Sequence, residues 1–364
     1  LRTSGQFAPV ASIRVSQPGI PSTWQLGFTW RRVMNGNGLA NEPVESNPSL
    51  AIAVLTFRRQ AELASLIPLL LAQADAVNSQ ADAYVLVVDN DPGRSAEEVV
   101  SDFGDDRVVY VHEPEPGIAT ARNCALSSAS DTDLLVFIDD DEIPASDWLV
   151  NLLRTYETYR SVGVVGNVLR EYETPPDPWI LAGRYFDRDP IDTGVRVHAA
   201  GTGNLMLDLN QVRQFNVTFD PIFGLSGGSD TLFTSQLVRA GGELVWCADA
   251  PVYEQIPANR LTRKWVVTRA FRIGNGGART ALALTTTTPE RTVVRFKEAG
   301  AGLARIGGGG AKYVIGKLTR NMEFDARGTR TFVRGVGRLS GAFGYHYDRE
   351  YRITRKKVLG KESG

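Results

Sequence analysis

Hydrophobic residues in the first half of the chain form short runs that alternate with segments of helical periodicity. The apolar runs, each of strand length, are Leu50–Leu55, Tyr84–Val88, Val108–Val111 and Asp133–Ile138. Helical spacing is found between them at residues 61–76, 95–103 and 119–129, and Ser95 is placed to cap the second of these helices. Strands that alternate with helices predict an α/β fold with a mostly parallel, Rossmann-like sheet flanked by helices.

The second half of the chain has a mixed pattern. Strands are expected at residues 162–169, 203–209 and 243–247, and a helix is expected at residues 230–240. Beyond Gly274 the chain is rich in glycine and basic residues, and its periodicity is weak. The regular alternation of strands and helices is therefore confined to the first half.

Charge divides the chain in two. Residues 1–254 contain 17 Lys and Arg against 34 Asp and Glu, whereas residues 255–364 contain 23 against 7. The overall net charge of −1 hides this division, which points to a basic C-terminal region with an anionic partner. A phosphorylated substrate, an anionic membrane face, nucleic acid and the protein's own acidic half are the candidates.

The composition excludes several classes of protein. Only two cysteines, Cys124 and Cys247, occur in 364 residues, so neither a disulfide framework nor a four-ligand zinc site is indicated. The sequence shows no compact apolar leader with a cleavage site, and no uninterrupted apolar window of about 18 residues that would span a bilayer. We therefore expect a cytoplasmic protein.

The apolar run that ends at Ile138 passes directly into four carboxylates, at Asp139, Asp140, Asp141 and Glu142. Adjacent carboxylates repel one another, so a cation is expected to hold them. In an open α/β sheet the carboxyl ends of the strands face the ligand crevice. A divalent cation that takes one or two carboxylates and completes its coordination with phosphate oxygens suits the Asp-x-Asp spacing. A solvated acidic turn is the alternative.

Three further polar residues lie at the ends of predicted strands or near the start of a predicted helix. Thr56 and Asp89 follow the first and second strands, where a hydroxyl and a carboxylate can contact a base and its ribose. Alternatively, Thr56 could cap the next helix and Asp89 could build its own turn. Arg122 lies early in a helix, where backbone donors and a guanidinium together favour phosphate, and a structural salt bridge is its alternative.

An ordered set of motifs resembles a known enzyme family. The motifs are Leu55-Thr-Phe57, Val87-Val-Asp-Asn90, Gly117-Ile-Ala-Thr-Ala-Arg-Asn123 and Phe137-Ile-Asp-Asp-Asp-Glu142. Together they resemble the family 2 inverting glycosyltransferases of the A-type fold, in particular bacterial exopolysaccharide enzymes of the succinoglycan glucosyltransferase type. The resemblance covers roughly residues 49–275, and the order of the motifs is more specific than any one of them.

The resemblance implies a nucleotide-sugar donor, a divalent metal (Mn²⁺ or Mg²⁺) and inversion at the anomeric carbon. In such enzymes the strand-end acid, Asp89 here, contacts the base, and the arginine of the Ala-Arg-Asn segment, Arg122 here, contacts the donor. The aspartate triplet binds ribose and metal. We accordingly assign Asp139 and Asp140 to the donor, and Asp139 and Asp141 to the metal.

Asp230 is the candidate catalytic base. A group separate from the metal must take the proton from the acceptor hydroxyl as that hydroxyl attacks the opposite face of the sugar. The family usually has a Glu-Asp pair here, preceded by glycines, and often another acid two residues on. This chain has Ser229 in place of the Glu and Leu232 in place of the later acid, which affects acceptor positioning more than the base. A helix N-cap role for Asp230 is the alternative.

Residues 252–257, 260–265 and 269–274 also resemble the succinoglycan-type branch. Many A-type enzymes have a histidine near the position of Glu254, which makes Glu254 a candidate metal ligand; pairing with Arg260 or Arg263 is the alternative. Arg269 and Arg272 lie three residues apart on one helix face and could clamp the donor diphosphate. A solvated basic face is the alternative for these two arginines.

We predict three regions of the chain. Residues 1–47 form a poorly ordered or peripheral N-terminal arm, residues 48–275 a catalytic domain, and residues 276–364 a basic C-terminal extension. The catalytic domain divides into a nucleotide-sugar half, residues 48–145, and an acceptor half, residues 146–275. The basic residues Arg352, Arg355, Lys356 and Lys357, interleaved with tyrosines, could lie on anionic lipid at the inner face of the cell membrane.

The predicted activity is metal-dependent transfer of a hexose from a UDP-linked donor to a saccharide or lipid-linked acceptor. Two other classes of function stay open. One is a non-catalytic sugar-nucleotide-binding protein whose altered Gly-Gly-Ser-Asp segment has lost turnover. The other is a metal-dependent nucleotidyl or phosphoryl transferase, because aspartate clusters at strand ends also serve that chemistry. Nucleic-acid binding is disfavoured, since no recognised module accompanies the basic segment.

Overall fold

The computed structural model describes residues 29–35, 38–44, 47–224 and 227–345. The chain divides into two compact units, residues 1–48 and 49–364. In the first unit, β1 (Thr29–Asn35) pairs antiparallel with β2 (Gly38–Val44). This hairpin lies within the predicted N-terminal arm, where the sequence pattern indicated no strand. Apart from Asn47, the rest of that arm falls outside the described residues.

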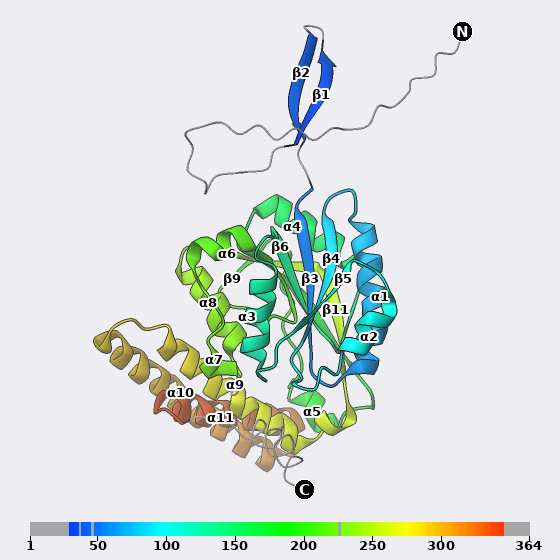
Figure 1. Cartoon of the computed structure of the whole chain (residues 1–364). Coiled ribbons are helices and arrows are strands. Elements are labelled where there is room, and N and C mark those ends of the chain that lie inside the picture. Colours follow the sequence, from blue (N-terminus) through cyan, green and yellow to red (C-terminus); the bar gives the residue numbers. More distant parts are fainter. Residues whose placement is uncertain (1–28, 36–37, 45–46, 225–226, 346–364) are drawn as a thin grey trace. The chain divides into compact units, whose positions relative to one another are not determined.

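A nine-stranded sheet forms the centre of the second unit (Figure 1). Its strands are β3 (Ser49–Thr56), β4 (Asp82–Asp89), β5 (Val108–His112), β6 (Leu134–Asp139), β7 (Glu142–Pro144), β8 (Gly163–Tyr172), β9 (Arg196–Val197), β10 (Asn204–Asp208) and β11 (Leu244–Ile256). Their order is β5-β4-β3-β6-β10-β8-β11-β7, with β9 paired to β11. Six strands share one direction and β7, β9 and β10 run opposite, which confirms the mostly parallel sheet.

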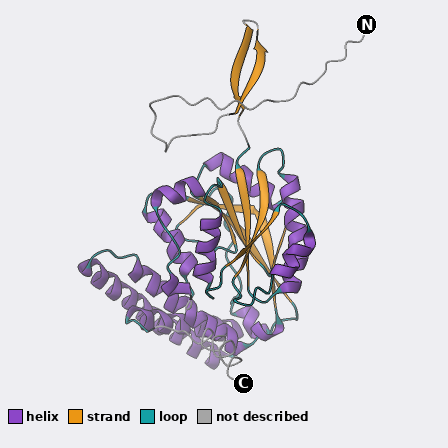
Figure 2. Cartoon of the chain, in the orientation of Figure 1, coloured by secondary structure: helices purple, strands orange, loops and turns teal. Residues whose placement is uncertain are grey.

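Helices cover both faces of the sheet (Figure 2). The helices on one face are α1 (Gln60–Ala76), α2 (Glu97–Phe103) and α4 (Trp148–Tyr159). Those on the other face are α3 (Ile118–Ser128), α6 (Leu209–Phe215), α7 (Pro221–Gly224) and α8 (Ser229–Arg239). Successive side chains of a strand point to opposite faces, so Ile52 packs in the first layer while Ala51 and Ala53 pack in the second. Both faces are apolar because both are covered.

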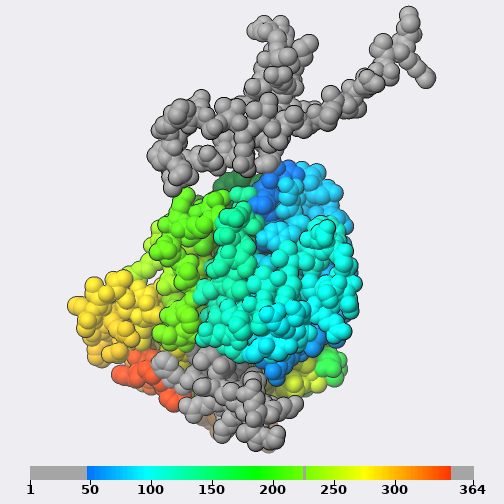
Figure 3. Space-filling view, viewed as in Figure 1, coloured from blue at the N-terminus to red at the C-terminus, as the bar shows by residue number. Residues whose placement is uncertain are grey.

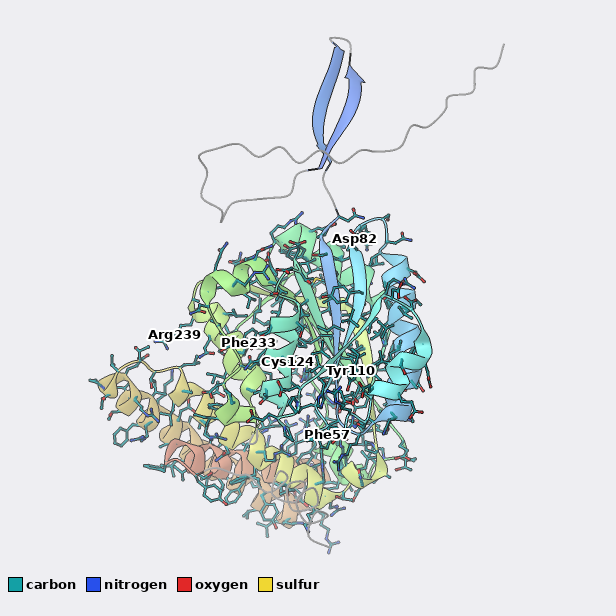
Figure 4. The ribbon with its side chains drawn as sticks, viewed as in Figure 1. Phe57, Asp82, Tyr110, Cys124, Phe233 and Arg239 are labelled. Atoms are coloured by element: carbon teal, nitrogen blue, oxygen red, sulfur yellow. The ribbon has the colours of Figure 1, made fainter. Side chains whose placement is uncertain are left out.

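The sheet register brings polar strand ends to one edge. Thr56 at the end of β3 lies opposite Asp89 at the end of β4, and Leu55 lies opposite Asp139 at the end of β6. Figure 4 shows the two edges of the sheet, with Asp82 at the start of β4 on one and Phe57, just beyond β3, on the other. The carboxyl edge near Phe57 is therefore where side chains from separate strands can meet.

The start of α2 differs from the prediction. The helix has Ala96 at its N-cap position and no side-chain cap, so the cap assigned to Ser95 is wrong. The Ser95 hydroxyl oxygen is buried and has no hydrogen-bond partner among the described residues. The backbone N–H of Ala96 instead donates to Oδ2 of Asp89, at 2.7 Å. A carboxylate from the preceding strand end thus binds the donor group that a local cap would have bound.

Three long helices form the C-terminal part of the second unit: α9 (Arg263–Ala283), α10 (Thr288–Thr319) and α11 (Met322–Ala342). In Figure 1 they gather beyond the carboxyl edge of the sheet, and Figure 3 shows part of their surface, coloured yellow to red. They join it through a buried cluster that contains Trp179 and Ile180 of α5 (Pro178–Ala182), Ile256 of β11 and Val266 of α9. Helix α9 runs through the boundary predicted between residues 275 and 276. Among the described residues, no helix is long and apolar enough to cross a membrane.

Glycines allow α10 and α11 to approach at backbone distance. A Cβ atom on Gly309 would lie 2.4 Å from the backbone N of Phe332, and one on Gly328 would lie 2.4 Å from the backbone N of Tyr313. Each helical glycine costs about 0.5–1 kcal/mol relative to alanine. Close contact between the two helices offsets this cost. Because these helices depend on backbone contact and not on a regular apolar pattern, the weak periodicity of this segment did not predict them.

Two adjacent glycines of α10 should respond oppositely to alanine. Gly309→Ala places a methyl group against the α11 backbone, and we expect it to destabilise the protein by about 1–3 kcal/mol. A Cβ on Gly308 would have no atom of the described residues within 4 Å, so Gly308→Ala should stabilise by about 0.5–1 kcal/mol. Thermal unfolding midpoints and hydrogen exchange of the two helices measure this. Equal effects at the two positions would contradict the close packing.

Candidate active site

A cavity of about 500 Å³ opens at the carboxyl edge of the sheet. The predicted site residues that line it are Thr56, Arg122, Asp139, Asp140, Asp141 and Glu254. They come from β3, α3, the end of β6 and β11, which are distant in sequence but adjacent at this edge. The cavity therefore brings together most of the residues predicted to bind donor and metal.

Arg59, a residue that was not predicted from the sequence, supplies the countercharge at the aspartate triplet. Its Nη1 lies 2.6 Å from Asp140 and 2.8 Å from Asp141. Arg59 directly precedes α1 and lines the cavity. The only sequence signal was its place just beyond the Leu-Thr-Phe motif. The guanidinium of Arg59 thus supplies part of the positive charge that was predicted at this acidic cluster.

The remaining negative charge of the cavity is incompletely compensated. Burial raises the pKa of Asp139 to about 6; Arg122 opposes this rise, and the charges of Asp141 and Asp140 add to it. Burial also raises the pKa of Glu142 well above its usual value, with the charge of Asp139 adding to the effect. The pKa of Asp140 is raised by burial as well, against the lowering effect of Arg59. A cation entering this cavity would therefore be stabilised.

Thr56 and Asp89 have different roles in the structure. The Thr56 hydroxyl donates to Oδ2 of Asp140 at 2.9 Å, and Arg59 takes the N-cap position of α1, so Thr56 is not the cap. Asp89 is fully buried and accepts hydrogen bonds from the N–H groups of Asp91 and Ala96, and from the Tyr110 hydroxyl. It does not line the cavity. The structure thus favours the turn-building alternative for Asp89 over contact with the base.

Arg122 lines the cavity, and one of its buried N–H donors has no hydrogen-bond partner among the described residues. Its Nη1 donates to the Ser229 hydroxyl at 2.8 Å, and its guanidinium lies 5.5 Å from the centre of the Phe219 ring. The side chain is only 8% exposed, and its Nε is buried without a hydrogen-bond partner among the described residues. A buried unpaired donor on a cation is costly, and an anion in the cavity would pair with it.

Asp230 lines a second cavity of about 410 Å³, together with Arg269, Arg272 and Trp265. Gly228 occupies the N-cap position of α8, so Asp230 lies in the first turn and the N-cap alternative is wrong. Oδ1 of Asp230 accepts a hydrogen bond from the next residue's N–H at 2.7 Å. Arg269 and Arg272 share one helix face, as predicted, but they line the cavity of Asp230 and not that of the aspartate triplet.

Arg269 lies against two aromatic rings that stack on each other. The guanidinium lies 5.6 Å from the Phe186 ring centre and 5.7 Å from the Trp265 ring centre. Burial, together with the charge of Arg170, lowers its pKa to about 10. This arginine stays positive near neutral pH but is poorly compensated, so an anionic group of a substrate would stabilise it.

A short glycine-containing segment approaches residues of both cavities. A Cβ on Gly203 would lie 2.8 Å from Oε1 of Glu142 and 3.0 Å from Oδ2 of Asp139. A Cβ on Gly201 would lie 3.4 Å from Oδ2 of Asp230. The carboxylates at the end of β6 and Asp230 therefore both adjoin one short stretch of backbone, residues 201–203. These glycines were not predicted from the sequence, because nothing local marks which side chains approach them.

Glu254 is engaged by arginines. Arg170 lies 3.1 Å from one of its carboxylate oxygens and Arg260 lies 3.5 Å from the other, whereas Arg263 pairs with Asp177. The ion-pair alternative is therefore observed, with Arg260 and not Arg263. Among the described residues, no group of three or more His, Cys, Asp or Glu side chains is arranged to hold a metal ion.

Neutralising Asp139 should change the pH dependence of stability. Because its folded pKa lies above its usual value of 3.8, the parent protein should lose stability as pH rises from about 4 to about 6. Asp139→Asn removes this loss, so above about pH 6 it should be more stable, by on the order of 2 kcal/mol. Thermal unfolding in EDTA against pH measures this, with Asp102→Asn, on the exposed face of α2, as control. A gain at pH 4 as large as that at pH 8 would contradict the shift.

Comparisons with known proteins agree with the sequence motifs. The family model described as Glycosyl transferase family 2 matches residues 51–208. The succinoglycan biosynthesis protein ExoM of Rhizobium meliloti (strain 1021) is 34% identical over 226 residues, which cover 61% of this chain and 72% of ExoM.

Solved structures also align with the chain. One is TarS 1-349 of S. aureus in complex with UDP, at 12% identity and a TM-score of 0.46, over 82% of this chain and 93% of that one. Another is GalNAc-T7 with UDP, GalNAc and Mn²⁺, at 12% identity and a TM-score of 0.44, over 66% of this chain and 48% of that one. On the family match and the identity to ExoM, the chain belongs to glycosyltransferase family 2 and is a glycosyltransferase with the A-type α/β fold.

Proposed function

We propose that this glycosyltransferase is an inverting hexosyltransferase that uses a UDP-linked sugar and a divalent metal. The unpaired, buried Nε of Arg122 beside the buried carboxylates carries the proposal. A site with both an unsatisfied cation and unsatisfied anions is complementary to a metal–diphosphate pair, which brings both charges. ExoM is named for the biosynthesis of succinoglycan, a polysaccharide, which supports a saccharide or lipid-linked acceptor in polysaccharide or glycolipid synthesis.

The diphosphate would lie at the start of α3. Pro116, Gly117 and Ile118 line the cavity there, and the helix begins without a side-chain cap. The first N–H groups of a helix are an anion site, and Arg122 lies just over one turn further on. Thr56 and Asp140 line the cavity, are hydrogen-bonded to each other and would contact the nucleoside.

The carboxylate set fits a metal held by few protein ligands. Asp140 is engaged by Thr56 and Arg59, and Glu254 by Arg170 and Arg260. Asp141 also pairs with Arg59, through Oδ2, so Asp139 is the first candidate and Asp141 the second. Mg²⁺ or Mn²⁺ bound by one or two carboxylates leaves positions for phosphate oxygens and water. Such an ion would offset the negative charge of the departing diphosphate.

Asp230 would act as the base. Its carboxylate lies in the second cavity, where Trp265 offers an aromatic surface for an acceptor sugar. As the acceptor hydroxyl attacks the anomeric carbon, Asp230 would take its proton. The hydrogen bond between Arg122 and Ser229, the residue before Asp230, ties the donor cavity to this helix turn. Residues 48–275 hold all of these groups, with the basic C-terminal extension beyond them.

Peripheral contact with an anionic membrane is also part of the proposal. The residues first predicted to make it, Arg352 to Lys357, lie outside the described residues. The positive charge of residues 276–345 supports such contact without them.

Arg122→Lys should weaken UDP binding. Lysine keeps the positive charge but loses the planar guanidinium that can pair with Ser229 and a phosphate at once. We expect the UDP dissociation constant in the presence of Mn²⁺ to rise about tenfold or more. Calorimetric titration measures it, and Arg154→Lys, on the exposed face of α4, is the matched control. Unchanged affinity with an unchanged melting point would exclude Arg122 from the donor site.

Asp230→Asn should separate binding from transfer. The amide keeps the size of the side chain but cannot accept the proton, so turnover should fall about 10²–10⁴-fold while UDP affinity changes little. Release of UDP from UDP-sugars with an oligosaccharide acceptor measures turnover, and Asp102→Asn serves as control. Transfer at the parent rate would show that another group is the base.

A further inference from the structure

Helix α10 has an unusual distribution of side chains. The residues it buries are Glu298, Ala299, Gly302, Gly309 and Gly316, and the last two abut the backbone of α11. Large apolar side chains instead point away from the protein. The most exposed are Val293 (67%), Phe296 (69%), Leu303 (58%), Val314 (51%) and Leu318 (80%). We call these five residues the α10 stripe.

The α10 stripe is continuous along one helix face. Its members are separated by 3, 7, 11 and 4 residues, which places them on one side of an α-helix. Between them on the same face lie Gly300 and Gly307, and no atom of the described chain lies within 4 Å of a Cβ built on either. From Val293 to Leu318 the stripe is about 38 Å long. Apolar surface of this extent is uncommon on a monomeric protein and marks a site of interaction.

Beyond Glu290, the charged residues of α10 are basic with one exception, and one of them, Lys317, pairs with Asp325 of α11. The basic residues from position 291 to 320 are Arg291, Arg295, Lys297, Arg305, Lys312, Lys317 and Arg320. The only acid in that range is Glu298, which is 4% exposed and pairs with Arg338 of α11. Glu290, at the start of the helix, pairs with Arg239 of α8. A partner that covers the stripe therefore meets apolar groups flanked by positive charge.

We infer that the α10 stripe lies on the surface of an anionic lipid bilayer. An apolar face flanked by lysine and arginine matches a membrane interface, where the apolar groups enter the acyl boundary and the cations meet lipid phosphates. A second copy of the chain would bring the same positive charges together, so the charge pattern disfavours self-association. The inference rests on the proposed membrane contact and assigns it to α10. It does not depend on the chemistry of sugar transfer.

Vesicle sedimentation tests the inference with the full chain. The parent protein should bind vesicles of phosphatidylcholine with phosphatidylglycerol, and bind pure phosphatidylcholine vesicles at least tenfold more weakly. Phe296→Ser/Leu303→Ser/Leu318→Ser should lose at least tenfold in partitioning to the anionic vesicles. Ile222→Ser, a change at a side chain on α7 that is also 69% exposed, is the matched control and should bind like the parent.

A second variant tests the charge. Lys297→Gln/Arg305→Gln/Lys312→Gln keeps the stripe and should lose most of the preference for anionic vesicles. Absence of parent binding to either vesicle, or equal binding by the parent and the serine variant, would overturn the inference. So would a parent dimer that the serine variant dissociates without any vesicle binding, because the stripe would then be a protein interface. UDP titration of each variant separates failure at the membrane from failure at the donor site.

Discussion

Countercharge at the carboxyl end of β6 is the interaction on which the rest of the site depends. Burial of Asp139 and Asp140 is costly unless cations lie near them. Arg59 approaches from α1 on one face of the sheet, and Arg122 approaches from α3 on the other. Both helices must therefore pack correctly before the acidic strand end is tolerated, so formation of the cavity is linked to formation of the fold.

Arg59 and Arg122 differ in how completely their hydrogen-bond donors are paired. Arg59 directs Nη1 at two carboxylates, whereas Arg122 donates to Ser229 and keeps a buried Nε without a partner among the described residues. Asp139 meanwhile keeps a raised pKa despite Arg122. Polar groups that are half satisfied inside a protein are costly, and such groups cluster at functional sites. This charge pattern supports binding of a ligand that carries both signs of charge.

The C-terminal helices invert the usual amphipathic arrangement. In α10, glycines face the neighbouring helix and Phe296, Leu303 and Leu318 face outward. The glycines permit backbone contact, which offsets their low helix propensity. The outward face then needs a different explanation from the core-facing stripe of an ordinary helix. Helix α9, which packs against α11, lines the second cavity, the part of the enzyme proposed to receive the acceptor.

The sequence by itself determined the strands β3 to β6, the helices between them and the acidic end of β6. Side-chain periodicity and the polar residues that end a strand are local properties of the sequence. The ordered motifs also determined the family. Only the tertiary structure decided the partners of the charged groups. Arg59 and Asp140 are 81 residues apart, and the role of Asp89 depends on how β5 and α2 surround it. Helices α10 and α11 were not predicted because contacts between their backbones, and not local propensity, hold them together.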